Sequence, residues 1–245
     1  MRLQTRILLR FILVGLTILL LTGALTYPNL EEQERDSIKK ESITQLEHID
    51  FALTYMIDEA GRDVEQLSMD ERVRYPDDSN FTNFLNATEE TFVYNITPEE
   101  QAIIDVLKDF QVSHPYVNSC YMGRENGAFV RAFPRASPTQ YDPRDRPWYQ
   151  QALGSPGMVV VTDPYRSVTT DDMNIGITIA LMDNGTVYGV VGADVTLVGL
   201  TSYMIEAGKV SGRDMILTDE VGTVLAFRDT GLLFTNVSEM MGGER

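Results

Sequence analysis

Apolar and polar residues follow three successive patterns along this chain, and each pattern predicts a different kind of element. The first is a long apolar run at Phe11–Leu25, with no acidic residue before Glu31 and three basic residues ahead of it: Arg2, Arg6 and Arg10. Counted from Ile7 to Tyr27, the run is long enough to cross a bilayer as a helix. Because basic residues flank the inner end of such helices, the remainder of the chain is expected outside the cytoplasm.

A cleaved signal peptide is the alternative for this segment. Thr22–Ala24 supplies small residues of the kind found at signal cleavage sites. We favour the anchor because the apolar stretch is longer than most signal-peptide cores. Both interpretations place the bulk of the protein outside the cytoplasm.

The second pattern is an apolar stripe with steps of three and four residues, formed by Leu46, Ile49, Leu53, Met56, Ala60, Val64 and Leu67. It predicts a helix from Glu31 to about Asp70, with Pro28 at or near a helix start. The stripe fits a helix that packs on a sheet and also the seam of a parallel homodimer. The turn-forming segment Tyr75–Asn80 is expected to end this helix.

The third pattern consists of short alternating runs separated by turn residues. Thr97–Glu100 has the residues of a capped helix start. Three hairpins are predicted at residues 116–133, 174–195 and 215–227, a buried strand at 158–161 and a helix at 197–207. The order of elements predicts an α+β fold in which a long N-terminal helix packs on an antiparallel sheet, with the strand pair of Val168–Val195 at its centre.

Composition restricts the classes of function. The net charge of −16 disfavours contact with nucleic acids and anionic lipid. Cys120 is the single cysteine, which excludes an intrachain disulfide and fits a small buried apolar residue. With His48 and His114 as the only histidines, neither a metal site nor a cofactor is expected. The chain has no catalytic motif, so we expect no enzyme; adjacent aspartates on loops fit solvated surface better than a hydrolase site.

The most unusual segment is Tyr141–Tyr149, which contains the only tryptophan, two tyrosines, two arginines and two prolines. The prolines stiffen the backbone. Arg146 offers a planar fork for a carboxylate, while Trp148 and Tyr149 offer flat walls with polar tips. The alternative is structural: the aromatic residues close a loop over a core and the arginine pairs with a neighbouring aspartate.

This Tyr-Asp-Pro-Arg-x-Arg-Pro-Trp-Tyr segment resembles the double Cache domain, the PAS-like extracellular sensor of many histidine kinases and chemoreceptors. A strand that ends in Gly192-Ala-Asp194 and is followed by a helix is typical of the same fold. The resemblance covers roughly Pro28 to the end of the chain. It implies that a ligand carboxylate meets Tyr141, Arg146 and Trp148.

The resemblance also implies that Tyr165 and Asp194 meet the ammonium group of an amino-acid ligand. Ser167, however, stands where the family has an aspartate. A hydroxyl binds ammonium more weakly than a carboxylate does. Asp163, two residues before Tyr165, is a candidate to compensate, and the resemblance therefore supports a small-molecule site more firmly than an α-amino acid.

Together these observations predict the extracytoplasmic sensor region of a membrane receptor, either a histidine kinase or a chemoreceptor, for a small carboxylate or amino-acid-like metabolite. The alternative is a structural or adhesive surface domain with a vestigial pocket. The expected organisation is a cytoplasmic N-terminus (1–6), a membrane helix (7–27), a stalk (28–75), a membrane-distal Cache module (76–207) and the start of a membrane-proximal module (208–245).

Overall fold

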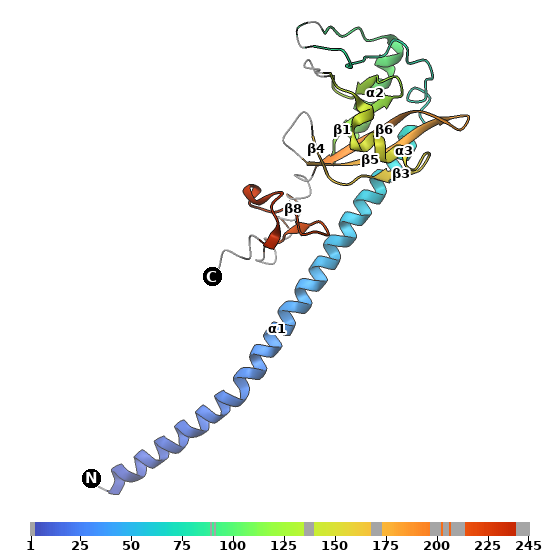
Figure 1. Ribbon diagram of the computed structural model, residues 1–245. Helices are drawn as coiled ribbons and strands as arrows, with labels where there is room; N and C mark the ends of the chain where they lie inside the picture. The colour runs from blue at the N-terminus through green and yellow to red at the C-terminus, as the bar shows by residue number, and fades with distance from the viewer. Residues whose placement is uncertain are drawn as a thin grey trace. The chain divides into compact units, whose positions relative to one another are not determined.

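A computed structural model describes the chain at residues 3–88, 90, 92–134, 140–167, 173–196, 202, 206 and 214–238 (Figure 1). By its internal contacts the chain divides into two compact units, residues 1–54 and residues 55–245.

The first unit consists of most of a single helix, α1, which extends over Leu3–Ser68 and ends inside the second unit. An 18-residue window of α1 has a mean hydropathy of 1.9, so the helix is apolar and long enough to cross a membrane. The expected helix start at Pro28 is wrong, because α1 continues through this residue. A proline inside a helix removes one backbone hydrogen bond, at a cost of about 3 kcal/mol, and the long helical sequences on both sides outweigh it.

The second unit is built on one antiparallel sheet. Its strands lie in the order β2-β1-β6-β5-β3, and β4 also pairs with β5. The strands are β1 (Val117–Arg124), β2 (Phe129–Arg131), β3 (Val159–Val161), β4 (Tyr165–Arg166), β5 (Met173–Asp183) and β6 (Thr186–Thr196). The two predicted hairpins of this sheet are confirmed, and β5 and β6 lie at its centre.

Local sequence explains the tight β5–β6 turn. Asn184 and Gly185 both have positive φ angles, 47° and 81°, as the two-residue hairpin turns of twisted sheets require. The expectation of a buried strand at 158–161 is wrong in one respect. Among the described strands β3 pairs with β5 alone and lies at the sheet edge, and Val161 is 47% exposed.

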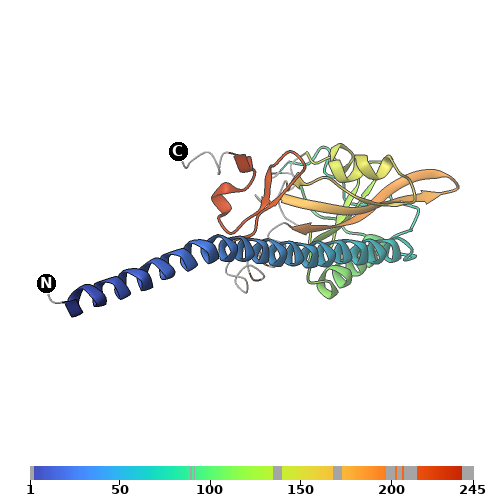
Figure 2. The same cartoon turned by 90° about the horizontal axis from the view of Figure 1, so that it is seen from below.

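The two faces of the sheet carry different layers. Figure 2 shows the last turns of α1 and helix α2 (Pro98–Ser113) on one side of the strands and helix α3 (Pro147–Leu153) on the other. Successive residues of a strand point to opposite faces. On β6, Val191 and Ala193 therefore join the α1–α2 core, whereas Gly192 and Asp194 face the α3 side.

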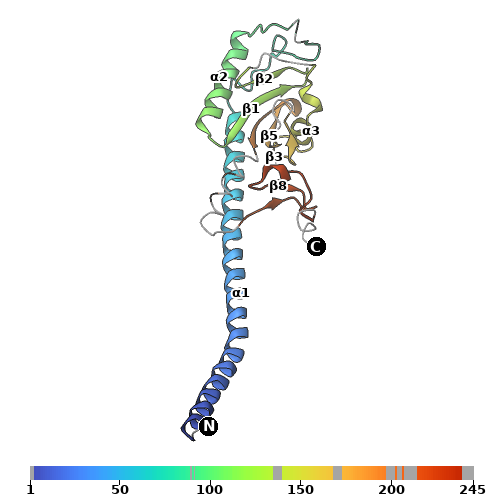
Figure 3. The same ribbon diagram turned by 90° about the vertical axis from the view of Figure 1, so that its left-hand side faces the viewer.

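The α1–α2 side is the larger apolar core. Thr97 caps α2 as predicted, because its hydroxyl accepts a hydrogen bond of 3.2 Å from the amide of Glu100. Ile103 and Leu107 of α2 are fully buried against the same core as Val64 of α1. Figure 3 shows α2 beside the end of α1. Cys120 is also fully buried in this core, as its sequence context predicted.

The remaining described segments are short. Residues 81–96 contain no helix or strand among those described and place three rings in one cluster: Phe84, Phe92 and Tyr94. The third predicted hairpin is a separate two-stranded sheet, β7 (Leu217–Thr218) with β8 (Val224–Ala226), followed by the 3-10 helix η2 (Thr230–Leu232). The predicted helix at 197–207 lies outside the described residues except for Ser202 and Glu206. The α+β class is confirmed.

Candidate functional site

The Tyr141–Tyr149 segment forms a 3-10 helix, η1 (Pro143–Asp145), which leads directly into α3. A proline occupies the first position of each helix, where its missing N–H costs nothing. Asp142 caps η1 by accepting a hydrogen bond of 2.9 Å from the amide of Arg144 and also binds the Arg144 guanidinium. The neighbouring aspartate thus pairs with Arg144 and leaves Arg146 for other contacts.

α3 carries aromatic side chains onto the sheet. Trp148 and Tyr149 are 2% and 3% exposed. The Trp148 ring lies 4.6 Å from the ring of Tyr121 on β1, centroid to centroid. The ring of Tyr141 packs at the same distance on Phe129 of β2. The segment therefore forms the lid of a second aromatic core on the α3 side of the sheet.

Gly123 of β1 makes this close approach possible. A Cβ at this position would lie 2.8 Å from Cη2 of Trp148 and 2.9 Å from Cβ of Pro143, closer than carbon atoms pack. We expect Gly123→Ala to lift α3 from the sheet and to lower the free energy of unfolding by about 1–3 kcal/mol. The fluorescence of Trp148, the single tryptophan, reports both the displacement and the unfolding transition.

Gly61→Ala is the matched control for this prediction. Gly61 lies in α1, and a Cβ there would be 3.4 Å from Cγ1 of Val159, which is an ordinary contact. Alanine also favours a helix over glycine by up to about 1 kcal/mol. A Gly123→Ala protein as stable as the Gly61→Ala protein, with unchanged fluorescence, would contradict the tight packing.

Beneath the aromatic lid lies a buried carboxylate. Asp194 of β6 is 5% exposed and accepts three hydrogen bonds. Oδ1 accepts from the hydroxyls of Tyr121 and Tyr165, the latter at 2.5 Å, and Oδ2 accepts from Nδ2 of Asn174 at 2.8 Å. The two tyrosine oxygens are 3.0 Å apart. Four strands thus meet at one acid.

Burial raises the pKa of Asp194 to about 6, although its three hydrogen bonds and the positive charge of Arg131 act in the opposite direction. The loss of hydration disfavours the charged form of an acid. At neutral pH the protein therefore holds a negative charge in its interior at a free-energy cost. Strongly perturbed acids of this kind concentrate at functional sites.

Two arginines lie around this network. The Arg146 guanidinium is 6.0 Å from the ring centre of Tyr165, and its Nη2 donates a hydrogen bond of 3.1 Å to the carbonyl oxygen of Arg166. The positive charge of Arg131 on β2 lowers the pKa values of both Asp194 and Tyr141. The charge of Arg146 likewise lowers the pKa of Tyr141. Burial nevertheless raises the pKa of Tyr141 to about 12. Tyr165 thus links Arg146 on its ring to Asp194 on its hydroxyl.

The structure brings some of the predicted residues together and places others apart. Ser167 is half-buried at the end of β4, close in sequence to Tyr165. Asp163 is exposed, and its described hydrogen bonds join it to Gln151 of α3. Tyr149 lies on the side of Gly123 and Glu125, and burial raises its pKa to about 12.

Sequence reasoning missed three residues of the network. Tyr121, Asn174 and Arg131 come from three strands that flank the predicted site residues. The period of two residues in a strand could have indicated part of this set. It places Phe129 and Arg131 on one face of the sheet, and it likewise places Tyr121 and Gly123 on one face. Which strand faces Asp194 depends on the sheet order, which the sequence did not specify.

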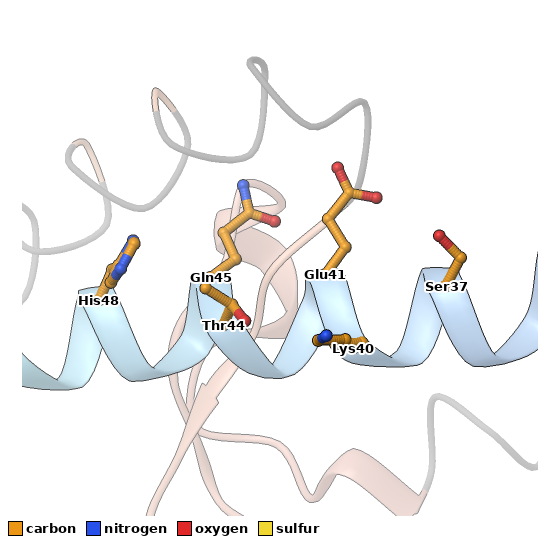
Figure 4. A pocket seen from close by; sticks show the side chains of 6 residues that line it. All are labelled: Ser37, Lys40, Glu41, Thr44, Gln45 and His48. Carbon is orange, nitrogen blue, oxygen red and sulfur yellow. The ribbon is translucent and has the colours of Figure 1, made fainter.

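A separate hollow lies in the first unit, along α1. Its lining residues are Ser37, Lys40, Glu41, Thr44, Gln45 and His48 (Figure 4). All six belong to one helix, which by itself cannot enclose a ligand. Among the described residues there is no group of three or more histidine, cysteine or acidic side chains placed to hold a metal ion.

Comparison with known families identifies the family of the domain. Residues 81–202 match the family of the first PDC sensor domain of methyl-accepting chemotaxis protein-like proteins. These residues form a Cache-type PDC sensor domain. The resemblance carried by Tyr141–Tyr149 is thereby confirmed at the level of the family.

Curated relatives of this PDC domain are chemoreceptors. McpB of Bacillus subtilis is 43% identical over 91 residues, and McpC of the same organism is 33% identical over 139 residues. These matches cover 36% and 56% of this chain but only 13% and 21% of the relatives. The chain thus spans about a fifth or less of the chemoreceptors it matches.

Solved structures show the same fold. The ligand-binding domain of the amino-acid chemoreceptor PctC of Pseudomonas aeruginosa, solved in complex with GABA, has a TM-score of 0.58 and 23% identity. The match covers 78% of this chain and 76% of that one. Methyl-accepting chemotaxis protein X has a TM-score of 0.55 and 16% identity, with coverage of 81% and 79%. The PDC domain therefore shares its architecture with chemoreceptor sensor domains.

Proposed function

We propose that this PDC domain binds a small metabolite with a carboxylate and a cationic end, and that it serves as the sensor of a membrane-anchored chemoreceptor. The observation that carries the proposal is the Arg146–Tyr165–Asp194 arrangement. It places a cation at the outer end and a buried anion at the inner end of one tyrosine side chain.

The charges explain why a ligand of this kind suits the site. A cationic group next to Asp194 would offset the cost of a buried negative charge. Arg146 can bind a carboxylate through two parallel hydrogen bonds after it releases the carbonyl of Arg166. Tyr141, Trp148 and Tyr165 supply the aromatic walls, while Tyr149, Ser167 and the exposed Asp163 are proposed to contribute at the periphery.

Signalling is proposed to pass through the sheet. β5 and β6 contribute Gly176 and Asp194 to the α3 side and Ile177 and Ala193 to the core that holds the end of α1. Because both sets belong to the same strands, a ligand that repositions α3 against the sheet also biases the packing of Val64 and its neighbours on α1.

The remaining features of the receptor are proposed with it. α1 would cross the cytoplasmic membrane at residues 7–27 and place the PDC domain outside the cytoplasm, with the stalk at 28–75 as a homodimer contact. Residues 76–207 would then form the membrane-distal Cache module, and residues 208–245 the start of the membrane-proximal module. The support is the apolar run in α1 and the chemoreceptor relatives.

Titration of the full chain in detergent tests the proposed site. Calorimetry with the standard amino acids, γ-aminobutyrate and simple organic acids is expected to find a ligand. Arg146→Ala is expected to reduce the affinity for that ligand by at least ~10-fold, because a charge-assisted hydrogen-bonded pair is lost.

Arg144→Ala is the matched control. Arg144 is two residues away, belongs to η1 and pairs with Asp142 on the surface. It should leave the affinity unchanged. If no compound binds, or if Arg146→Ala binds the best ligand as tightly as Arg144→Ala does, the proposed function is wrong.

A further inference from the structure

Asn174 occupies a restricted place in the sheet. It lies on β5, opposite Thr196 on one side and Tyr165 on the other, and is 3% exposed. Its Nδ2 donates to Oδ2 of Asp194 at 2.8 Å. An ionised carboxylate only accepts hydrogen bonds. The amide orientation is therefore determined, and Oδ1 is the atom left over.

Oδ1 of Asn174 has no hydrogen-bond partner among the described residues. Buried polar atoms in folded proteins are nearly always paired, so an unpaired one needs an explanation. The nearby hydroxyls of Tyr121 and Tyr165 cannot supply the partner, because both already donate to Asp194. Within the part of the chain that the structure describes, no group is therefore placed to donate to this oxygen, and a bound ligand could supply the donor.

The neighbouring carboxylate of Asp194 can also accept a further hydrogen bond. Oδ1 of Asp194 accepts two hydrogen bonds and Oδ2 accepts one, whereas each carboxylate oxygen can accept about two. One acceptor site on Oδ2 and the Oδ1 of Asn174 thus remain, on two side chains joined by a hydrogen bond. A positive group with at least two N–H bonds matches both acceptors at once.

We propose that Asn174 is a specificity-determining residue that selects ligands with a primary ammonium group. The inference rests on the proposed function and refines it. The ammonium donates one hydrogen to Oδ2 of Asp194 and another to Oδ1 of Asn174. A dimethylated amine has one N–H and leaves one acceptor buried without a partner.

The first experiment needs only the wild-type chain. Calorimetry in detergent compares γ-aminobutyrate and L-alanine with their N,N-dimethyl forms and with butyrate and propionate, which lack nitrogen. The primary amine is expected to bind at least ~10-fold more tightly than its dimethyl form. Equal affinity of the two forms overturns the inference and indicates that a water molecule satisfies both acceptors.

The second experiment uses Asn174→Leu, which keeps the side-chain volume and removes the amide. The primary amine is expected to lose at least ~10-fold in affinity, and the preference over the dimethyl form is expected to vanish. A purely structural role would weaken both forms alike and leave their ratio unchanged, which refutes the inference. If Asn174→Leu does not fold, the wild-type comparison decides alone.

The two proposals fail in different ways. Tight binding of butyrate or propionate without any amine ligand keeps the carboxylate site and overturns the role of Asn174. No binding of any of the six probes or of the standard amino acids rejects both. Tight binding of a primary amine that Arg146→Ala leaves unchanged rejects the proposed carboxylate contact but retains the role of Asn174.

Discussion

The Asp194→Asn variant is expected to bind amine ligands with at least ~100-fold lower affinity than wild type. At pH 7 the same variant is expected to have a higher free energy of unfolding than wild type. Removal of a buried charge that faces a cation costs several kcal/mol of binding free energy. The gain in stability has a separate cause. In the unliganded protein Asp194 holds a buried negative charge with Arg131 as its charged neighbour.

The hydrogen-bond network can accommodate this substitution. The introduced amide oxygen can accept from the hydroxyls of Tyr121 and Tyr165 as the carboxylate does. The introduced NH2 group would meet Nδ2 of Asn174, but that amide can turn over and present Oδ1, which has no partner among the described residues. The fold is therefore retained.

The pH dependence identifies the charge as the cause. The pKa of Asp194 is raised from 3.8 to about 6 in the folded protein. Between these values the folded state holds a proton that the unfolded chain has released, so this contribution to stability is complete below pH 3.8 and is lost as the pH rises through 6. The ionised form then costs about 3 kcal/mol. Relative to wild type, the variant should gain about 1–3 kcal/mol between pH 4 and pH 7.

Urea unfolding followed by Trp148 fluorescence at several pH values measures this difference. Asp183→Asn, at the exposed end of β5, is the control because its carboxylate is not buried. Calorimetry on the same proteins measures ligand affinity. A variant that binds an amine as wild type does, or whose stability difference is independent of pH, would show that Asp194 has no such role.

Arg124→Met is expected to lower the free energy of unfolding by about 2–4 kcal/mol. Arg124 of β1 is fully buried, and its Nη2 donates hydrogen bonds of 2.9 Å to the carbonyls of Val73 and Tyr75. The guanidinium also lies 4.9 Å from the ring centre of Tyr188. Methionine fills the space but leaves two carbonyls unpaired.

The position of these carbonyls gives the variant a second phenotype. They belong to the segment that follows α1, so Arg124 attaches the end of that helix to the sheet. We expect proteolysis between Ser68 and Tyr75 to accelerate in Arg124→Met. The control is Arg74→Met in the same segment, because Arg74 is exposed and the only described hydrogen bond of its side chain is a long one of 3.5 Å. Equal stability of the two variants would show that Arg124 does not attach the end of α1 to the sheet.

Local sequence was sufficient for most elements of the fold. The apolar run, the stripe to Leu67, the Thr97 cap and the Asn184–Gly185 turn depend on neighbours a few residues away, and the elements they predict are present. Pro28 and β3 were misjudged because the first depends on the helix on both sides and the second on its place at the sheet edge.

The candidate site divides along the same line. The residues of the Tyr141–Tyr149 segment are unusual enough for the sequence to single it out, and the family resemblance added Asp194 at a strand end. Both remain predicted site residues. Only the tertiary structure decided that Tyr121, Asn174 and Tyr165 converge on that acid, because their strands are distant in sequence and become neighbours through the order β1-β6-β5 with β4 on β5. The raised pKa of Asp194 belongs to the same category, because burial arises from packing and cannot be read from an aspartate in a sequence.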